Sequence, residues 1–199
     1  MSVTIYVEGG GPSKARNTAA KCRQGFHQFL DKLLPNKKKP RIVASGSRDE
    51  TYGDFRAALS KGNDSFILLL VDSEEPVRAG STSWEHLAKW WIRPADTEED
   101  QAHLMVQCME SWFLADKETL AAYFGQGFEA GGLPKNPQIE AIPKSDVLAS
   151  LTHASRNTKK KRYSKGSHAF EILALVDSAK VCAASRFAAQ LRDCLLEKL

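Results

Sequence analysis

The sequence predicts a three-layer α/β protein in which helices cover both faces of a mostly parallel sheet. Strand-like and helix-like segments alternate three times over the first 71 residues, which is the pattern of parallel strands joined by helical crossovers. Residues 66–71 are six consecutive apolar residues, and such a run is typical of a strand buried on both faces of a parallel sheet. Helical patterns dominate the last third of the chain, so we expect a helical carboxyl-terminal extension on this sheet.

The first part of the chain contains three predicted strands, at residues 3–7, 41–45 and 66–71. The first is a short β-rich run, the second has apolar residues at its centre, and the third is wholly apolar. Helices are predicted at residues 13–34 and 49–59, because apolar residues recur there at helical spacing and a proline or glycine follows the last turn.

The middle of the chain continues this alternation. Residues 83–91 predict a helix, residues 103–108 a fourth strand and residues 117–124 another helix. Residues 125–143 are rich in glycine and proline, which predicts a loop on the surface.

The carboxyl-terminal part predicts three more helices, at residues 145–151, 167–176 and 179–199. The basic segment 155–166 between them has no helical pattern.

The length of 199 residues fits one domain. We expect an α/β core at residues 1–124, with the loop and helices of residues 125–199 packed on it. The content of 42% hydrophobic and 26% charged residues is that of an ordinary soluble globular protein. A formal net charge of +4 permits contact with nucleic acid but does not by itself indicate it.

No segment predicts contact with a membrane. No apolar run approaches the roughly 20 residues that span a bilayer, and Glu8 interrupts the first apolar run too early for a signal peptide. The dispersed cysteines form no CxxC pair, which predicts reduced thiols and a cytoplasmic protein. They are Cys22, Cys108, Cys182 and Cys194.

Acidic residues follow three of the predicted strands. Glu8 follows the first, Asp72 and Glu74 follow the third, and Glu110 follows the fourth. The carboxyl ends of parallel strands lie at one edge of a sheet, and alternate residues of an extended segment point the same way. Carboxylate oxygens gathered there suit Mg²⁺ or Mn²⁺. The alternative is that each acid caps a helix or pairs with a lysine.

These positions carry a family resemblance. Glu8 followed by glycines, and Asp72-Ser73-Glu74 after a hydrophobic strand, resemble the metal-binding pattern of the TOPRIM fold. That fold occurs in topoisomerases, primases and OLD-family nucleases, and its second acid is most often aspartate where this chain has Glu74. Residues 7–11, 70–72 and 110–116, together with Tyr163-Ser164-Lys165, are similar to a bacterial family of unknown function with a TOPRIM-like core. Members of that family are often encoded beside an AAA-type ATPase.

The resemblance implies a metal-dependent active site. Asp72 and Glu74 would hold Mg²⁺ or Mn²⁺, and Glu8 would complete the metal shell or act as general base. Glu110 would supply an outer ligand. The chemistry implied is phosphodiester cleavage in DNA or RNA by a nuclease that works with the ATPase in bacterial defence. The alternatives are a non-catalytic subunit that binds nucleic acid or the ATPase, and a phosphohydrolase of small nucleotides.

Contact with a phosphate would fall to residues beside these acids. Backbone amides at Gly9 and Gly10 can approach a phosphate closely, and Lys14 follows the same strand end. Lys165 matches the Tyr-Ser-Lys segment of the family. The glycines do not form a P-loop, because no Gly-Lys-Ser/Thr sequence follows them.

Two further features suggest surfaces for binding. Tyr163 lies among basic residues, so this segment either contacts phosphates with one stacking ring or is simply a solvated loop. The basic residues are Arg156, Lys159, Lys160, Lys161, Arg162 and Lys165. Trp90 lies off the helical face that Trp84 and Trp91 share, which indicates a partner surface.

Overall fold

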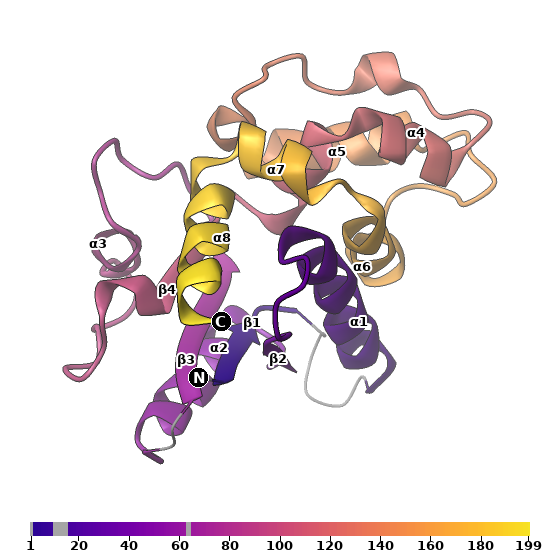
Figure 1. The fold of residues 1–199 in the computed structure, drawn as a ribbon. Coiled ribbons are helices and arrows are strands. Elements are labelled where there is room, and N and C mark those ends of the chain that lie inside the picture. The colour runs from indigo at the N-terminus through magenta and orange to yellow at the C-terminus, as the bar shows by residue number, and fades with distance from the viewer. Residues whose placement is uncertain (1, 10–15, 63–64) are drawn as a thin grey trace.

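A computed structural model describes residues 2–9, 16–62 and 65–199 of the chain (Figure 1). Its sheet has four parallel strands, β1 (Ser2–Val7), β2 (Arg41–Ala44), β3 (Ser65–Asp72) and β4 (Ala102–Met105), in the order β2-β1-β3-β4. The predicted α/β fold with a parallel sheet is therefore confirmed.

The long apolar run lies at the centre of this sheet. β3 pairs with β1 on one side and with β4 on the other, so both of its edges are hydrogen bonded. Leu68 and Leu70 belong to the apolar cluster on one face, whereas Ile67, Leu69 and Val71 belong to the cluster on the opposite face. Because neither face meets water, the strand needs no polar alternation.

Helices cover both faces of the sheet, which gives three layers. On one face, α1 (Arg16–Leu33) packs against α6 (Lys165–Leu175) and α7 (Ser178–Ala184). On the other face lie α2 (Arg48–Leu59) and α3 (Ser83–Leu87).

The remaining helices come from the second half of the chain. They are α4 (Lys117–Phe124), α5 (Lys144–Ala154) and α8 (Arg186–Lys198). Short 3₁₀ helices also occur, at η1 (Glu99–Gln101), η2 (Met109–Ala115), η3 (Ala130–Gly132) and η4 (Ile139–Ala141). No helix in the described ranges is both long and apolar enough to cross a membrane.

Several predicted boundaries were wrong for local reasons. The long helix predicted at residues 179–199 is two helices, because Ser185 has an extended backbone and its hydroxyl accepts a hydrogen bond from the Ala188 amide at the start of α8. The helix predicted at residues 83–91 ends at Leu87. Beyond it, Trp91 leaves the helix to stack on Tyr52 of α2, with ring centroids 4.4 Å apart.

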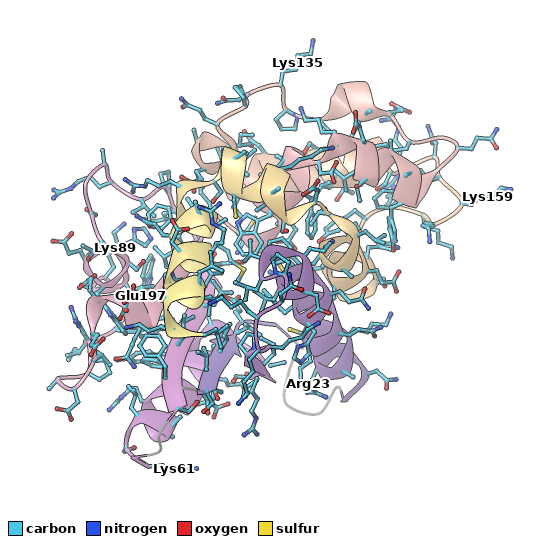
Figure 2. All side chains as sticks on the ribbon, in the orientation of Figure 1. Arg23, Lys61, Lys89, Lys135, Lys159 and Glu197 are labelled. Carbon is cyan, nitrogen blue, oxygen red and sulfur yellow. The ribbon has the colours of Figure 1, made fainter. Side chains whose placement is uncertain are left out.

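The basic segment is also shorter than predicted, because α6 already begins at Lys165. Tyr163 is only 6% exposed, so its ring does not stack on a ligand, which corrects that expectation. Lys159 does project outward into solvent, as the solvated-loop alternative requires (Figure 2).

Candidate active site

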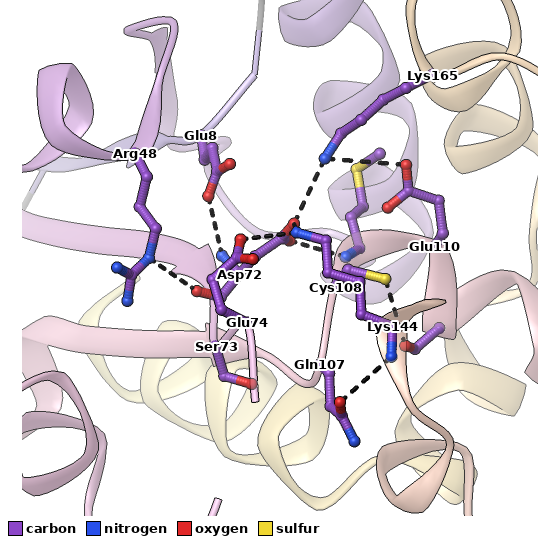
Figure 3. A network of polar contacts seen from close by, with 12 residues as sticks. Glu8, Arg48, Asp72, Ser73, Glu74, Gln107, Cys108, Glu110, Lys144 and Lys165 are labelled. Carbon is purple, nitrogen blue, oxygen red and sulfur yellow. Dashed lines mark hydrogen bonds and ion pairs between the residues drawn. The ribbon is translucent and has the colours of Figure 1, made fainter. Parts of the chain in front are cut away.

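Glu8 and Asp72 meet because their strands are neighbours. Asp72 is the last residue of β3, and Glu8 directly follows β1, which pairs in parallel with β3. The Asp72 amide donates a hydrogen bond of 3.3 Å to Glu8 Oε2 (Figure 3). Carboxylate oxygens of Glu8, Asp72 and Glu74 all lie within 4.8 Å of one another. The structure thus brings together three of the four acids that the sequence singled out.

Glu74 reaches this group through a turn and not through an extended segment. Its φ is +66°, in the left-handed region, and its amide donates to the Gln107 carbonyl at 2.9 Å. The preceding Ser73 amide donates to the Met105 carbonyl of β4 at 3.0 Å. The expectation that alternation alone aligns Asp72 with Glu74 was therefore wrong, because a turn anchored on the neighbouring segment aligns them.

Asp72 is the buried centre of the site. It is only 1% exposed, and its Oδ1 accepts a 2.8 Å hydrogen bond from the amide of Met109, the first residue of η2. Its Oδ2 faces two ammonium groups, those of Lys144 at 3.2 Å and Lys165 at 3.4 Å. A carboxylate buried to this degree needs such partners, because an unpaired charge would be costly to remove from water.

Lys144 begins α5 and joins two of the acids. Its Nζ lies 3.2 Å from Asp72 Oδ2 and 2.7 Å from Glu74 Oε1, and its amide donates to Gln107 Oε1 at 3.3 Å. Burial opposes the charge of Lys144, but the Asp72 and Glu74 carboxylates outweigh burial and raise its pKa. Sequence reasoning missed this lysine, since nothing near residue 144 links it to a strand that ends 72 residues earlier.

Lys165 begins α6 and lies on the other side of Asp72. Its Nζ is 3.4 Å from Asp72 Oδ2 and 3.9 Å from Glu110 Oε1. Burial disfavours its charge, but the surrounding carboxylates prevail and hold its pKa above the ordinary value. The sequence-predicted lysine is therefore at the site, and it contacts the acids directly.

Glu110 lies beside the site but outside the group of three carboxylates. It is fully buried in η2, and its Oε1 accepts a 2.9 Å hydrogen bond from the Tyr163 hydroxyl. Its Oε2 has no hydrogen-bond partner among the described residues. Burial and the Glu110 charge raise the pKa of Tyr163, so this phenol stays protonated and donates.

Arg48 is a further cation at this edge. It is the first residue of α2, and its Nε donates to the Asp72 carbonyl at 3.2 Å. Its guanidinium carbon lies 4.2 Å from the centroid of the Trp90 ring and 4.3 Å from that of Trp91. Arg48 thus connects the turn after β3 with a pair of indoles.

The glycine after Glu8 has a structural role. Gly9 has a φ of +135°, and a Cβ there would lie 2.8 Å from the Phe170 ring. Its amide donates to the Gly46 carbonyl at 2.9 Å, so this N–H already has a partner inside the protein. Gly10 and Lys14, which we also expected to contact a phosphate, lie outside the described residues.

Charges of both signs set the proton affinity of Glu8. Burial and the nearby Asp72 carboxylate raise the pKa of Glu8 to about 7, against the opposing effect of Lys165. The buried thiol of Cys108 has its pKa raised to about 12 by burial and by Glu110, so it stays protonated and is a poor metal ligand.

Asp116, the last acid of the segment 110–116, serves the fold. It caps α4 by accepting a hydrogen bond from the Thr119 amide, and it pairs with Lys180 at 2.8 Å. Asp116 is therefore a helix cap and not a ligand of the carboxylate site.

The donor set fits a hard divalent cation. Three carboxylates from two adjacent strand ends offer oxygen atoms close enough to share one ion, which is the donor type that Mg²⁺ and Mn²⁺ prefer. Such an ion would share Asp72 and Glu74 with the ammonium of Lys144. The site therefore places carboxylate ligands and ammonium groups in the same small volume.

Comparison with known proteins identifies the family. Residues 7–195 match the family model described as a domain of unknown function, DUF4276, and the chain belongs to this family. No curated protein and no solved structure matches the chain.

Proposed function

We propose that this DUF4276 protein is a divalent-cation-dependent hydrolase that cleaves phosphodiester bonds in nucleic acid. One observation carries the proposal: acids and cations from distant parts of the chain converge at the carboxyl edge of the parallel sheet, where α/β proteins bind ligands. The acids are Glu8, Asp72 and Glu74, and the cations are Arg48, Lys144 and Lys165.

In this proposal Glu8, Asp72 and Glu74 hold Mg²⁺ or Mn²⁺. A bound Mg²⁺ would polarise a phosphoryl oxygen and lower the pKa of a coordinated water. Glu8 lies beside Asp72 and would accept the proton that this water loses. Lys144 and Lys165 both lie within 3.4 Å of Asp72 Oδ2 and would stabilise the negative charge that develops on the phosphate.

The relationship to the TOPRIM fold is part of the same proposal. It is supported by an acid that directly follows β1 and an acid pair at the end of β3, on strands that are neighbours in the sheet. We include an AAA-type ATPase partner and a role in anti-phage defence on the strength of the sequence resemblance alone.

A second candidate is a non-catalytic subunit that uses this fold to bind nucleic acid or its partner. The observation in its favour is that Lys144 and Lys165 already neutralise Asp72. A carboxylate that is satisfied by two ammonium groups can serve stability without any metal ion.

Cleavage and metal binding separate these candidates. Labelled single-stranded DNA, duplex DNA and RNA are incubated with the protein and Mn²⁺, and Mn²⁺ binding is measured by calorimetry. We expect Asp72→Asn to abolish both cleavage and Mn²⁺ binding. Glu75→Gln is the matched control, because Glu75 is adjacent to the site but pairs with the exposed Lys89, and this variant should keep both properties. A wild-type protein that binds no Mn²⁺ and cleaves none of the polymers overturns the proposal, and cleavage of mononucleotides alone would reassign it as a phosphohydrolase.

A further inference from the structure

An open groove lies next to the site, on the α2 side of the sheet. It has a volume of about 880 Å³ and runs between α2 and the segment 90–95 that follows α3. Aromatic and basic side chains form much of its lining, including Tyr52, Arg56, Trp90, Trp91 and Arg93. Neither the family assignment nor the carboxylate site accounts for this surface.

Trp90 is the exposed aromatic ring of this groove. Trp90 is 40% exposed, and Ile92, two residues later, is 89% exposed. The Arg48 guanidinium supports the Trp90 ring at 4.2 Å and the Trp91 ring at 4.3 Å. Trp91 in turn stacks on Tyr52 with an interplanar angle of 3°. The Lys89 ammonium also lies 5.5 Å from the Trp90 centroid, and Trp90 keeps 40% of its surface exposed to solvent.

The groove is tied to the turn that carries the acids. Arg48 donates to the Asp72 carbonyl at 3.2 Å, and His86 Nε2 lies 2.8 Å from the Ser73 carbonyl. The His86 and Trp90 rings are also in contact, with centroids 5.6 Å apart. Arg48 and His86 each contact both the Trp90 ring and a backbone carbonyl of the segment that carries the acids. A chain-like ligand at the carboxylates could extend into the groove.

The charge of the groove favours an anionic ligand. Arg56 and Arg93 line it, and Asp49 is the acid among its lining residues. The Asp49 carboxylate already accepts a 3.0 Å hydrogen bond from Trp91 Nε1. Arg93 pairs with Glu99 at 2.6 Å, which leaves Arg56, whose guanidinium lies 5.7 Å from the Tyr52 centroid, as the more available cation.

We propose that this groove binds an unpaired segment of nucleic acid, with one base stacked on Trp90. The inference rests on the proposed function and adds to it the substrate class, single-stranded DNA or RNA. Bases in a duplex are already stacked on both faces, so an isolated indole gains a base only from an unpaired strand. Arg56 would contact the backbone of the same strand, because phosphates are bound mainly by basic side chains.

Binding is measured apart from cleavage, by fluorescence anisotropy of a labelled oligo(dT) strand and of a labelled duplex of equal length. The Asp72→Asn protein is used throughout, so that no probe is cut. Adding Trp90→Ala is expected to weaken binding of oligo(dT) about tenfold, the order of magnitude for one lost stacked base. Trp90→Phe should restore part of it, and affinity for the duplex should stay the same. Leu175→Ala, which truncates an apolar residue that is 52% exposed on α6, is the matched control and should change nothing.

Each result bears on the inference separately from the proposed function. The inference is overturned if adding Trp90→Ala leaves the affinity for oligo(dT) unchanged. It is also overturned if adding Trp90→Ala weakens binding of oligo(dT) and of the duplex equally. A change in sedimentation coefficient on Trp90→Ala without a change in oligo(dT) binding overturns it as well and would make the groove a protein interface. If wild-type protein binds no Mn²⁺ and cleaves none of the polymers, but oligo(dT) binding depends on Trp90, the proposed function fails and the inference stands. If cleavage depends on Asp72 and is indifferent to Trp90, the inference alone fails.

Discussion

The ammonium of Lys144 lies 2.7 Å from the carboxylate of Glu74, although 70 residues separate them in the chain. The same ammonium is 3.2 Å from Asp72, so the start of α5 supplies the positive charge between two acids of the β3 turn. A metal ion bound by these acids would meet this ammonium, and the contact therefore relates the stability of the protein to its affinity for metal.

Lys144→Met should make the metal-free protein less stable and Mn²⁺ binding tighter. Removing the ammonium leaves Asp72 with fewer partners, which we expect to cost about 2–3 kcal/mol of unfolding free energy. Thermal unfolding with and without Mn²⁺ measures both effects, and saturating Mn²⁺ should recover most of the loss. Lys89→Met is the control, because the Lys89–Glu75 pair is exposed and worth at most about 1 kcal/mol. A variant whose melting temperature ignores Mn²⁺ would argue against a shared cation position.

His103 should make the protein sensitive to mild acid. Burial in β4 lowers the pKa of His103 from 6.5 to about 4. Above pH 6.5 the ring is neutral in both the folded and the unfolded chain, so His103 does not reduce the free energy of unfolding. As the pH falls from 6.5 to 4 the unfolded chain binds a proton that the folded protein rejects, and about 3 kcal/mol is lost.

Urea unfolding at a series of pH values tests this. His103→Gln should flatten the profile between pH 6.5 and 4, whereas His153→Gln, at an exposed position, should leave it as in the wild type. An unchanged slope in the His103→Gln protein would show that other groups cause the acid sensitivity.

Two glycines should respond to alanine in opposite ways. Gly9→Ala forces a Cβ to within 2.8 Å of Phe170 at a φ of +135°, and we expect a loss of about 2–4 kcal/mol. Gly53 lies inside α2 with open space around it, so Gly53→Ala should stabilise the protein by about 0.5–1 kcal/mol. Chemical denaturation of both variants makes the comparison. Similar midpoints for the two would contradict the described backbone at Gly9.

The hydroxyl of Tyr163 should contribute more to the stability of the protein than an ordinary surface hydroxyl does. Tyr163→Phe removes the 2.9 Å hydrogen bond to the buried Glu110, and the carboxylate then lacks a hydroxyl donor, at a cost of about 1–3 kcal/mol. Tyr123→Phe, whose hydroxyl donates to the exposed Glu171 at 2.7 Å, should cost less than about 1 kcal/mol.

The same Tyr163→Phe change is then measured in a protein that also carries Glu110→Leu. There the Tyr163→Phe change should cost far less, because both polar groups are gone. Equal costs in the two backgrounds would mean that the contact with Glu110 does not determine the role of Tyr163.

The sequence predicts those features that depend on neighbouring residues or on the rules of parallel sheets. The run 66–71 is uniformly apolar because β3 lies between β1 and β4 with both faces covered, and this can be inferred without a structure. Glu8 and Asp72 could be placed together for a similar reason, since adjacent parallel strands end at the same edge.

Features that depend on contacts distant in the sequence could not be predicted in this way. Lys144 contacts residues 70 and 72 positions away, and no pattern around Pro143 points to them. The separation of Glu110 from the three carboxylates depends on η2, a 3₁₀ helix that the spacing of apolar residues does not reveal. The break before α8 depends on one serine cap within an otherwise helical pattern.

Three basic residues at the site, among those that the structure describes, occupy the same position within their helices. Arg48, Lys144 and Lys165 are each the first residue of a helix, α2, α5 and α6. The amino-terminal end of a helix carries a partial positive charge from its aligned peptide dipoles, so a basic residue there is disfavoured by roughly 0.3–1 kcal/mol. The acids at the sheet edge offset this repulsion. The basic residues and the acids therefore each reduce the energetic cost of the other. Replacing both the basic residues and the acids with neutral residues would remove that repulsion. We therefore expect such replacements to raise the thermal stability of the protein and to abolish the activity of the site.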